Sequence, residues 1–243
     1  MKLFSRFFQL CIFLMILAVI FRDFTCRLAF TLGLSMGLGT RVKIDSAHLD
    51  LKNTQLDLHG IEIKNPTDFG SGPLAKIPHL YFDWEISSLW EGRLHLETVE
   101  MEISEIHIMQ LEKGKWNILE LKPMHSTGAS KGGRSKRTEE SAKPLRFRID
   151  RLVVSIDQAT YSDLSSGVAK VKVIPLGIRN AQYQGIQSAG DMVKIVFWES
   201  SKRMGISGLS NTLGRIQKDL GIRGVESVQG FFEKTVAAMR DRL

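Results

Sequence analysis

The chain has 243 residues, of which 43% are hydrophobic, and a net charge of +7 at pH 7. This length allows one or two small domains. The charge does not indicate a nucleic-acid-binding protein, because residues 1–40 carry +3 and residues 122–143 carry +4, which leaves the rest of the chain neutral. The only cysteines are Cys11 and Cys26, which excludes a disulfide framework or a cysteine-based zinc site in the remaining chain.

A mostly apolar run occupies residues 3–21, with Lys2 before it and Arg6 near its start. Its length is close to the roughly 20 residues that a helix needs to cross a bilayer. We predict a transmembrane anchor over residues 1–23, with the N-terminus in the cytoplasm and the rest of the chain exported. A cleaved signal peptide and a buried soluble helix are the alternatives, although the run is long for a signal and lacks a small-residue cleavage site.

Residues 24–39 are predicted to form a short juxtamembrane helix that leads the chain away from the bilayer. Strand-type alternation then dominates residues 40–123, which we predict to be the first half of a sheet. The predicted elements are a hairpin over 42–51 and 55–63, a strand over 80–86, and a long bent strand or hairpin over 94–111. In the last segment the alternation shifts near Thr98 and near Glu105, and each shift predicts a bulge or a turn.

Residues 124–142 are rich in Gly, Ser and charge, which predicts a flexible basic loop. Its charge is typical either of contact with an anionic lipid surface or of a solvated loop. Residues 143–200 are predicted to be the second half of the sheet, a meander ending in a strand over 192–198. That last segment is apolar on both faces, so we expect the strand to be covered on both sides.

Residues 205–243 change to helical spacing and predict an amphipathic C-terminal helix with a break. This helix either caps the apolar face of the sheet or lies on a membrane. The predicted fold is therefore mainly β with flanking helices: a transmembrane helix, a curved antiparallel sheet that forms a groove, and the C-terminal helix.

Residues that would indicate catalysis or a cofactor do not occur in a recognisable pattern. The six histidines show no metal-ligand spacing, and we interpret them as solvated or structural. The glycine-rich Gly70–Gly72 does not connect a strand to a helix, and no serine-nucleophile motif is present. We expect no enzyme activity, no metal, no cofactor and no nucleic-acid partner.

Four motifs follow one another in the first half of the chain: Gly39–Ile44, Leu58–Gly70 with its Asn65-Pro66 turn, Ile86–Gly92, and Gly114–Leu119 with its Asn117 turn. In these motifs and their order, residues 1–121 resemble the N-terminal region of AsmA-like envelope proteins. In the second half, Leu152–Asp163 is similar to strands that recur in the same family. Members are often much longer than this chain.

The resemblance implies an inner-membrane helix followed by β-rich periplasmic segments. It also implies a curved sheet with an apolar concave face, related to the grooves of TamB and of chorein-type bridge-like lipid carriers. The same alternation would also suit an ordinary core under the C-terminal helix. The residues that would line the groove are Leu80, Phe82, Trp84, Ile86, Val99, Met101 and Ile103.

We therefore expect a single-pass inner-membrane protein whose C-terminal domain lies in the periplasm, and which handles membrane lipid or supports envelope assembly without catalysis. The alternative is a membrane-tethered scaffold that binds a protein partner through a sheet edge or the C-terminal helix. A groove of a dozen strands spaced about 4.8 Å apart reaches only about 55–60 Å. Lipid transfer across the periplasm would thus require a protein partner or a homo-oligomer.

Overall fold

The structure is a computed structural model of the whole chain. The residues that it describes are 21–85, 87–88, 91–112, 114–125, 146–165, 167 and 169–204, with the single positions 13, 214 and 216. The anchor predicted over 1–23, the loop over 124–142 and the helix over 205–243 lie almost wholly outside them. Among the described residues, no helix is long and apolar enough to cross a membrane.

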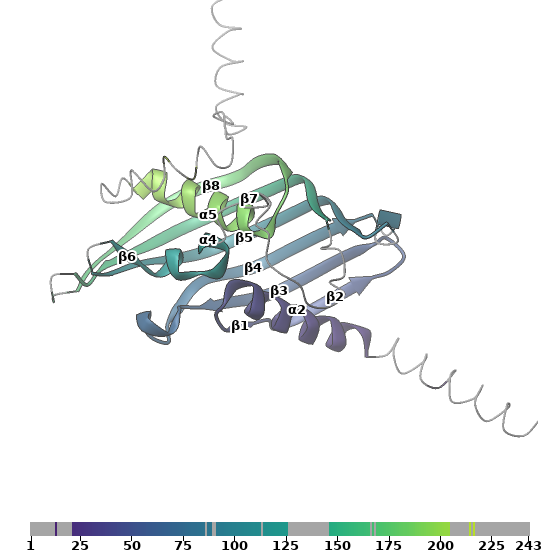
Figure 1. Cartoon of the computed structure of the whole chain (residues 1–243), viewed down its shortest axis with the longest axis horizontal. Helices are drawn as coiled ribbons and strands as arrows, with labels where there is room; N and C mark the ends of the chain where they lie inside the picture. Colours follow the sequence, from purple (N-terminus) through teal and green to yellow (C-terminus); the bar gives the residue numbers. More distant parts are fainter. Residues whose placement is uncertain are drawn as a thin grey trace, which may run out of the picture.

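One sheet contains every described strand, in the order β1-β3-β4-β5-β7-β8, with β2 paired to β3 and β6 paired to β5. The predicted mainly β fold with flanking helices is confirmed, and the two predicted halves form one continuous sheet (Figure 1). The strands are β1 (Val42–Lys43), β2 (Ser46–Asp50), β3 (Gln55–Lys64), β4 (Pro73–Trp84), β5 (Arg93–Glu112), β6 (Lys115–Trp116), β7 (Arg146–Asp163) and β8 (Lys170–Ile186).

The prediction of an antiparallel sheet is wrong at its centre, where β5 and β7 are parallel from Arg93–Arg146 to Gln110–Asp163. All other described strand pairs are antiparallel. The physical reason is the long connection between the two strands, since a parallel pair requires a crossover of at least a dozen residues. Residues 113–145 supply that length, and β7 begins beside the start of β5, where Arg146 pairs with Arg93.

The two shifts of alternation in β5 have different structures. Near Thr98 the register between β4 and β5 shifts after the Asp83–Thr98 pair, which confirms the predicted bulge. Near Glu105 the described pairs of β5 with β4 and with β7 keep their register, so the predicted bulge or turn there is wrong. Instead, the neighbouring strands also switch which alternate residues are buried, at the same position along the sheet. In β3 this switch falls at Gly60, whose φ is +64°.

The strand predicted over 192–198 is instead part of a helix, α5 (Ala189–Met204). A helix that is buried nearly all round hides its period, and a short apolar run cannot be assigned by pattern alone. The side chain that identifies its start is Ser188, whose Oγ accepts a hydrogen bond from the backbone N–H of Asp191 at 3.1 Å. Tyr183 on β8 donates a hydrogen bond to Glu199, which fixes α5 on the sheet.

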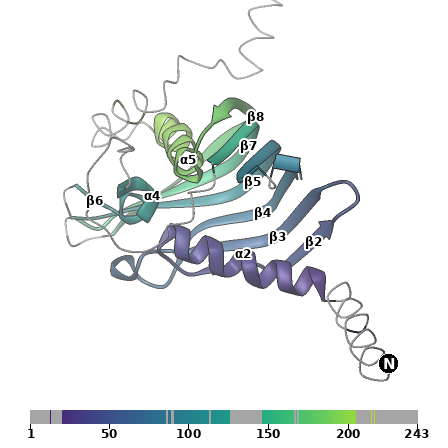
Figure 2. The same cartoon turned by 45° about the vertical axis from the view of Figure 1, so that its right-hand side comes forward.

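The described helices cover one face of the sheet (Figure 2). The helix α2 (Arg22–Leu38), close to the predicted 24–39, packs over β1 and β2, whereas α5 packs over β7 and β8. Between them lie the short α4 (Lys122–His125) and the 3-10 turn η2 (Asn117–Glu120), while a second such turn, η1 (Thr67–Phe69), precedes β4. The hydrophobic core lies between this helical layer and the sheet and includes Ile216.

The two asparagine turns of the family-like motifs meet in the fold. Asn117 is fully buried, and its Nδ2 donates hydrogen bonds to Asn65 Oδ1 and to the His107 carbonyl, both at 2.7 Å. Its Oδ1 accepts from the backbone N–H groups of Met109 and Ile118, both at 2.9 Å. One amide thus connects the turn before β4 to the end of β5, which gives these degenerate motifs a structural reason.

Candidate functional site

An apolar cavity of about 410 Å³ lies between α2 and α5, against the face of the sheet that these helices cover. Its volume falls in the range of about 300–1,000 Å³ that is typical of small-molecule sites. Every described residue that lines it is apolar, so these residues offer no titratable group that could act as a general acid. A lining of this kind suits an apolar group better than a polar one.

The structure brings five of the seven predicted groove residues together on the floor of this cavity. They are Leu80, Phe82 and Trp84 on β4, with Met101 and Ile103 on β5. Leu80 and Ile103 are buried, and the other three are half-buried.

The other two predicted groove residues do not contribute to the described lining. Val99 belongs to the fully buried core, and Ile86 lies outside the described residues. The floor residues belong to or pack against the core, so the groove and the core that we weighed as alternatives occupy the same face of the sheet.

The walls of the cavity come from helices that the sequence analysis did not assign to it. Phe30, Leu34 and Leu38 of α2 form one wall, and Met192, Val193 and Val196 of α5 form the other. The rings of Phe30 and Phe82 lie 6.0 Å apart between centroids, so α2 contacts the floor directly. Phe30, Leu34 and Leu38 recur every four residues in the sequence, and this spacing could have indicated the α2 wall. The α5 wall was not predicted because residues 192–198 were assigned to a strand.

A histidine ties three strand ends together near the side of the cavity lined by Leu94. His95 on β5 contacts Glu85 Oε2 through Nδ1 at 2.8 Å and Asp150 Oδ2 through Nε2 at 2.7 Å. These two carboxylates raise the pKa of His95 above its usual value, Glu85 having the larger effect. Through these two contacts His95 joins β7 and the segment after β4 to β5 at this end of the sheet.

The outer side of α2 carries a second apolar stripe that faces away from the sheet. The stripe continues from the predicted anchor with spacings of three and four residues, so it covers one side of the helix. Exposure in the stripe rises to 69% at Met36. The members of this outer stripe are Phe21, Phe24, Leu28, Leu32 and Met36.

A polar hollow of about 620 Å³ adjoins the C-terminal end of the outer stripe. Leu32 and Met36 form its apolar border. Arg41, Lys64 and Lys122 place cations in its lining, and Lys64 is paired with Glu62. Lys122 Nζ donates a hydrogen bond to the Met36 carbonyl at 3.0 Å, which holds one cation beside the end of α2. Apolar and cationic groups thus lie side by side on this surface.

Comparison with known proteins identifies the family. The model of the AsmA family matches residues 53–202, more than half of the chain, and the chain belongs to that family. This range extends the resemblance seen in the sequence through β7, β8 and most of α5. Searches of curated proteins and of solved structures return no match. Membership in the AsmA family is consistent with an envelope-related or lipid-related function.

Proposed function

We propose that the protein is a non-catalytic lipid-handling protein, anchored in the inner membrane by residues 3–21 and holding its β domain in the periplasm. The observation that carries the proposal is the 410 Å³ cavity with its wholly apolar described lining, which suits an acyl chain. Family membership and the apolar run of the sequence support the location.

The outer stripe of α2 supports the same proposal from a second direction. Exposed apolar patches of this kind mark interaction surfaces, and the stripe begins where the apolar run of residues 3–21 ends. The bilayer interface is the nearest apolar phase for a helix that directly follows a membrane anchor. The cations of the adjoining hollow suit anionic headgroups on that surface.

The first test measures bound lipid. The full chain is extracted gently from membranes, exchanged repeatedly into fresh detergent, and analysed by native mass spectrometry followed by lipid extraction. We expect stoichiometric phospholipid, because an acyl chain held in the cavity is retained while lipid around the anchor exchanges with detergent. A folded protein free of lipid would contradict the proposal.

The scaffold function is the second candidate, and one observation favours it. Val171 and Val173 near the start of β8 are 63% and 57% exposed, and β8 is the last strand of the described sheet order. An exposed edge strand can pair with another chain. A lipid-free protein that appears in the same spectrum as a dimer or as a complex with a second protein would make this function the better account.

The position of α2 is tested with a fluorescent label. We expect a nitrobenzoxadiazole dye on Met36→Cys, in a chain with Cys11 and Cys26 replaced by Ala, to be quenched by spin-labelled lipid in reconstituted vesicles. The matched control is Val171→Cys, which is similarly exposed and which we expect to stay in water. Equal quenching at the two positions would contradict an interfacial α2.

A further inference from the structure

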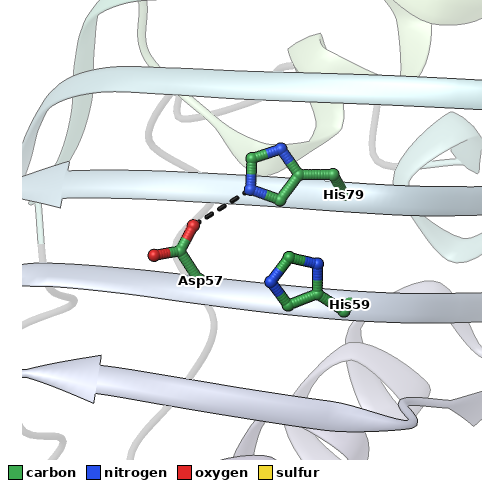
Figure 3. A group of neighbouring side chains, drawn as sticks. All are labelled: Asp57, His59 and His79. Atoms are coloured by element: carbon green, nitrogen blue, oxygen red, sulfur yellow. Dashed lines mark hydrogen bonds and ion pairs between the residues drawn. The ribbon is translucent and has the colours of Figure 1, made fainter.

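Two histidines and an aspartate converge on the face of the sheet opposite the cavity (Figure 3). Asp57 and His59 are two residues apart on β3 and so share one face of that strand. His79 on β4 is directly opposite His59 in the antiparallel register. The neighbouring Leu58 and Leu80 are buried on the other face, so strand alternation holds all three polar side chains on the outer face.

The distances within this group suit a single cation. One ligand atom from each of the three residues can be chosen so that all lie within 4.8 Å of one another. Asp57 Oδ1 is 2.9 Å from His79 Nε2, and the two imidazole rings are stacked with centroids 5.0 Å apart. Ligand atoms about 2.1 Å from a tetrahedral ion are about 3.4 Å apart, so small rotations of the side chains would close the site.

The chemistry of the group matches a divalent transition-metal ion. Imidazole nitrogen with carboxylate oxygen is a donor set that Zn²⁺ and its neighbours accept, and three protein ligands leave a position open. His59 is exposed while Asp57 and His79 are half-buried, so an ion could enter from solvent past His59.

The electrostatic surroundings of the group favour positive charge. Glu102 on β5 is opposite His79 in the register, and Tyr81 lies beside it on β4. Tyr81 donates a hydrogen bond to Asp83 Oδ2 at 3.5 Å, and Asp83 shares a face of β4 with His79, so Glu102 and Asp83 both place negative charge near the group.

His95 provides a contrast within the same sheet. It has two carboxylates within 3 Å, but Glu85 and Asp150 contact opposite nitrogens of its ring. A single ion cannot bind both carboxylates together with His95, because they lie on different sides of the imidazole ring. The arrangement around His95 is therefore an ion-pair bridge. In the group on β3 and β4, by contrast, the ligand atoms converge on one point.

From this convergence we propose that Asp57, His59 and His79 form a binding site for a divalent transition-metal ion on the outer face of the sheet. The proposal is independent of the cavity and of lipid binding. It revises the expectation that His59 and His79 are only solvated or structural, and it assigns a metal ion to the outer face of the sheet.

The test uses Zn²⁺ and the full chain in detergent, purified without a polyhistidine tag and stripped of metal. Isothermal calorimetry is expected to show one Zn²⁺ per chain, and Zn²⁺ is expected to raise the melting temperature because it binds the folded state. His59→Ala and His79→Ala should each weaken binding at least about tenfold, because even the loss of a residue that only orients a metal ligand typically costs that much. His95→Ala is the matched control and should bind Zn²⁺ as the parent does.

The proposal is overturned if the parent binds no Zn²⁺, or if His59→Ala and His79→Ala bind it as tightly as the parent. Asp57→Asn is the second variant, used if a histidine variant does not fold, because the amide has the shape of the carboxylate and lacks its charge. Weakened binding in Asp57→Asn supports the site, whereas unchanged binding and an unchanged melting shift overturn it.

Discussion

Replacing Val196 by tryptophan is expected to reduce bound lipid at least tenfold, which corresponds to about 1.4 kcal/mol of binding free energy. Val196 is half-buried on the α5 wall of the cavity, so an indole at this position would occupy space meant for an acyl chain. Native mass spectrometry and a phosphorus assay of extracted lipid measure the change. The variant should remain folded, because the cavity offers room for the larger side chain.

The matched control for this variant is Val171→Trp on β8, which adds the same volume at a position that is 63% exposed and outside the described cavity lining. If Val196→Trp folds and carries as much lipid as the parent, the cavity is not where lipid binds. If Val196→Trp does not fold, Met101→Trp fills the cavity from the β5 side and is judged by the same measurement.

The replacement Asn117→Ala is expected to lower the free energy of unfolding by about 3–5 kcal/mol, because it leaves several buried hydrogen-bonding groups without partners. Asn65 Oδ1, the His107 carbonyl and the N–H groups of Met109 and Ile118 all lose a partner. For a domain of this size, such a loss lowers the melting temperature by roughly 6–20 °C. Thermal unfolding in detergent, followed by circular dichroism, measures it.

Asn53→Ala is the control for the loss of an asparagine. Asn53 is exposed in the turn between β2 and β3, where its side chain bonds only to Asp50 among the described contacts. Its replacement should change stability by about 0.5 kcal/mol or less. A change below about 1 kcal/mol in Asn117→Ala, less than the usual cost of one unsatisfied buried group, would show that the two asparagine turns are not coupled through this amide.

The strands were predictable where one face of the sheet is buried. Leu80, Phe82 and Trp84 alternate with polar neighbours, and this period is enough to locate β4 in the sequence. The partner of each strand was not predictable, because alternation indicates a face and carries no information on register. The parallel β5–β7 pair depends on the long connection between them, whose path the alternation does not specify.

The lack of information on register also explains which parts of the cavity and of the proposed metal site were predictable. The floor of the cavity follows from alternation in β4 and β5, whereas its α5 wall required Ser188 to be recognised as a helix cap. His59 and His79 are twenty residues apart and show no spacing typical of a metal site. Only the register of β3 with β4 brings them side by side.

The parallel pairing at the centre of the sheet has a kinetic consequence. Strand β5 completes its contacts only after β7 has been synthesised, since paired residues such as Arg93 and Arg146 are far apart in the sequence. Contacts of such long range slow folding, because the chain loses loop entropy before they form. During synthesis, an early meander of β1 to β5 would therefore present an unpaired apolar edge until the β7–β8 hairpin arrives. That waiting interval is when a chaperone would act and when aggregation competes most strongly.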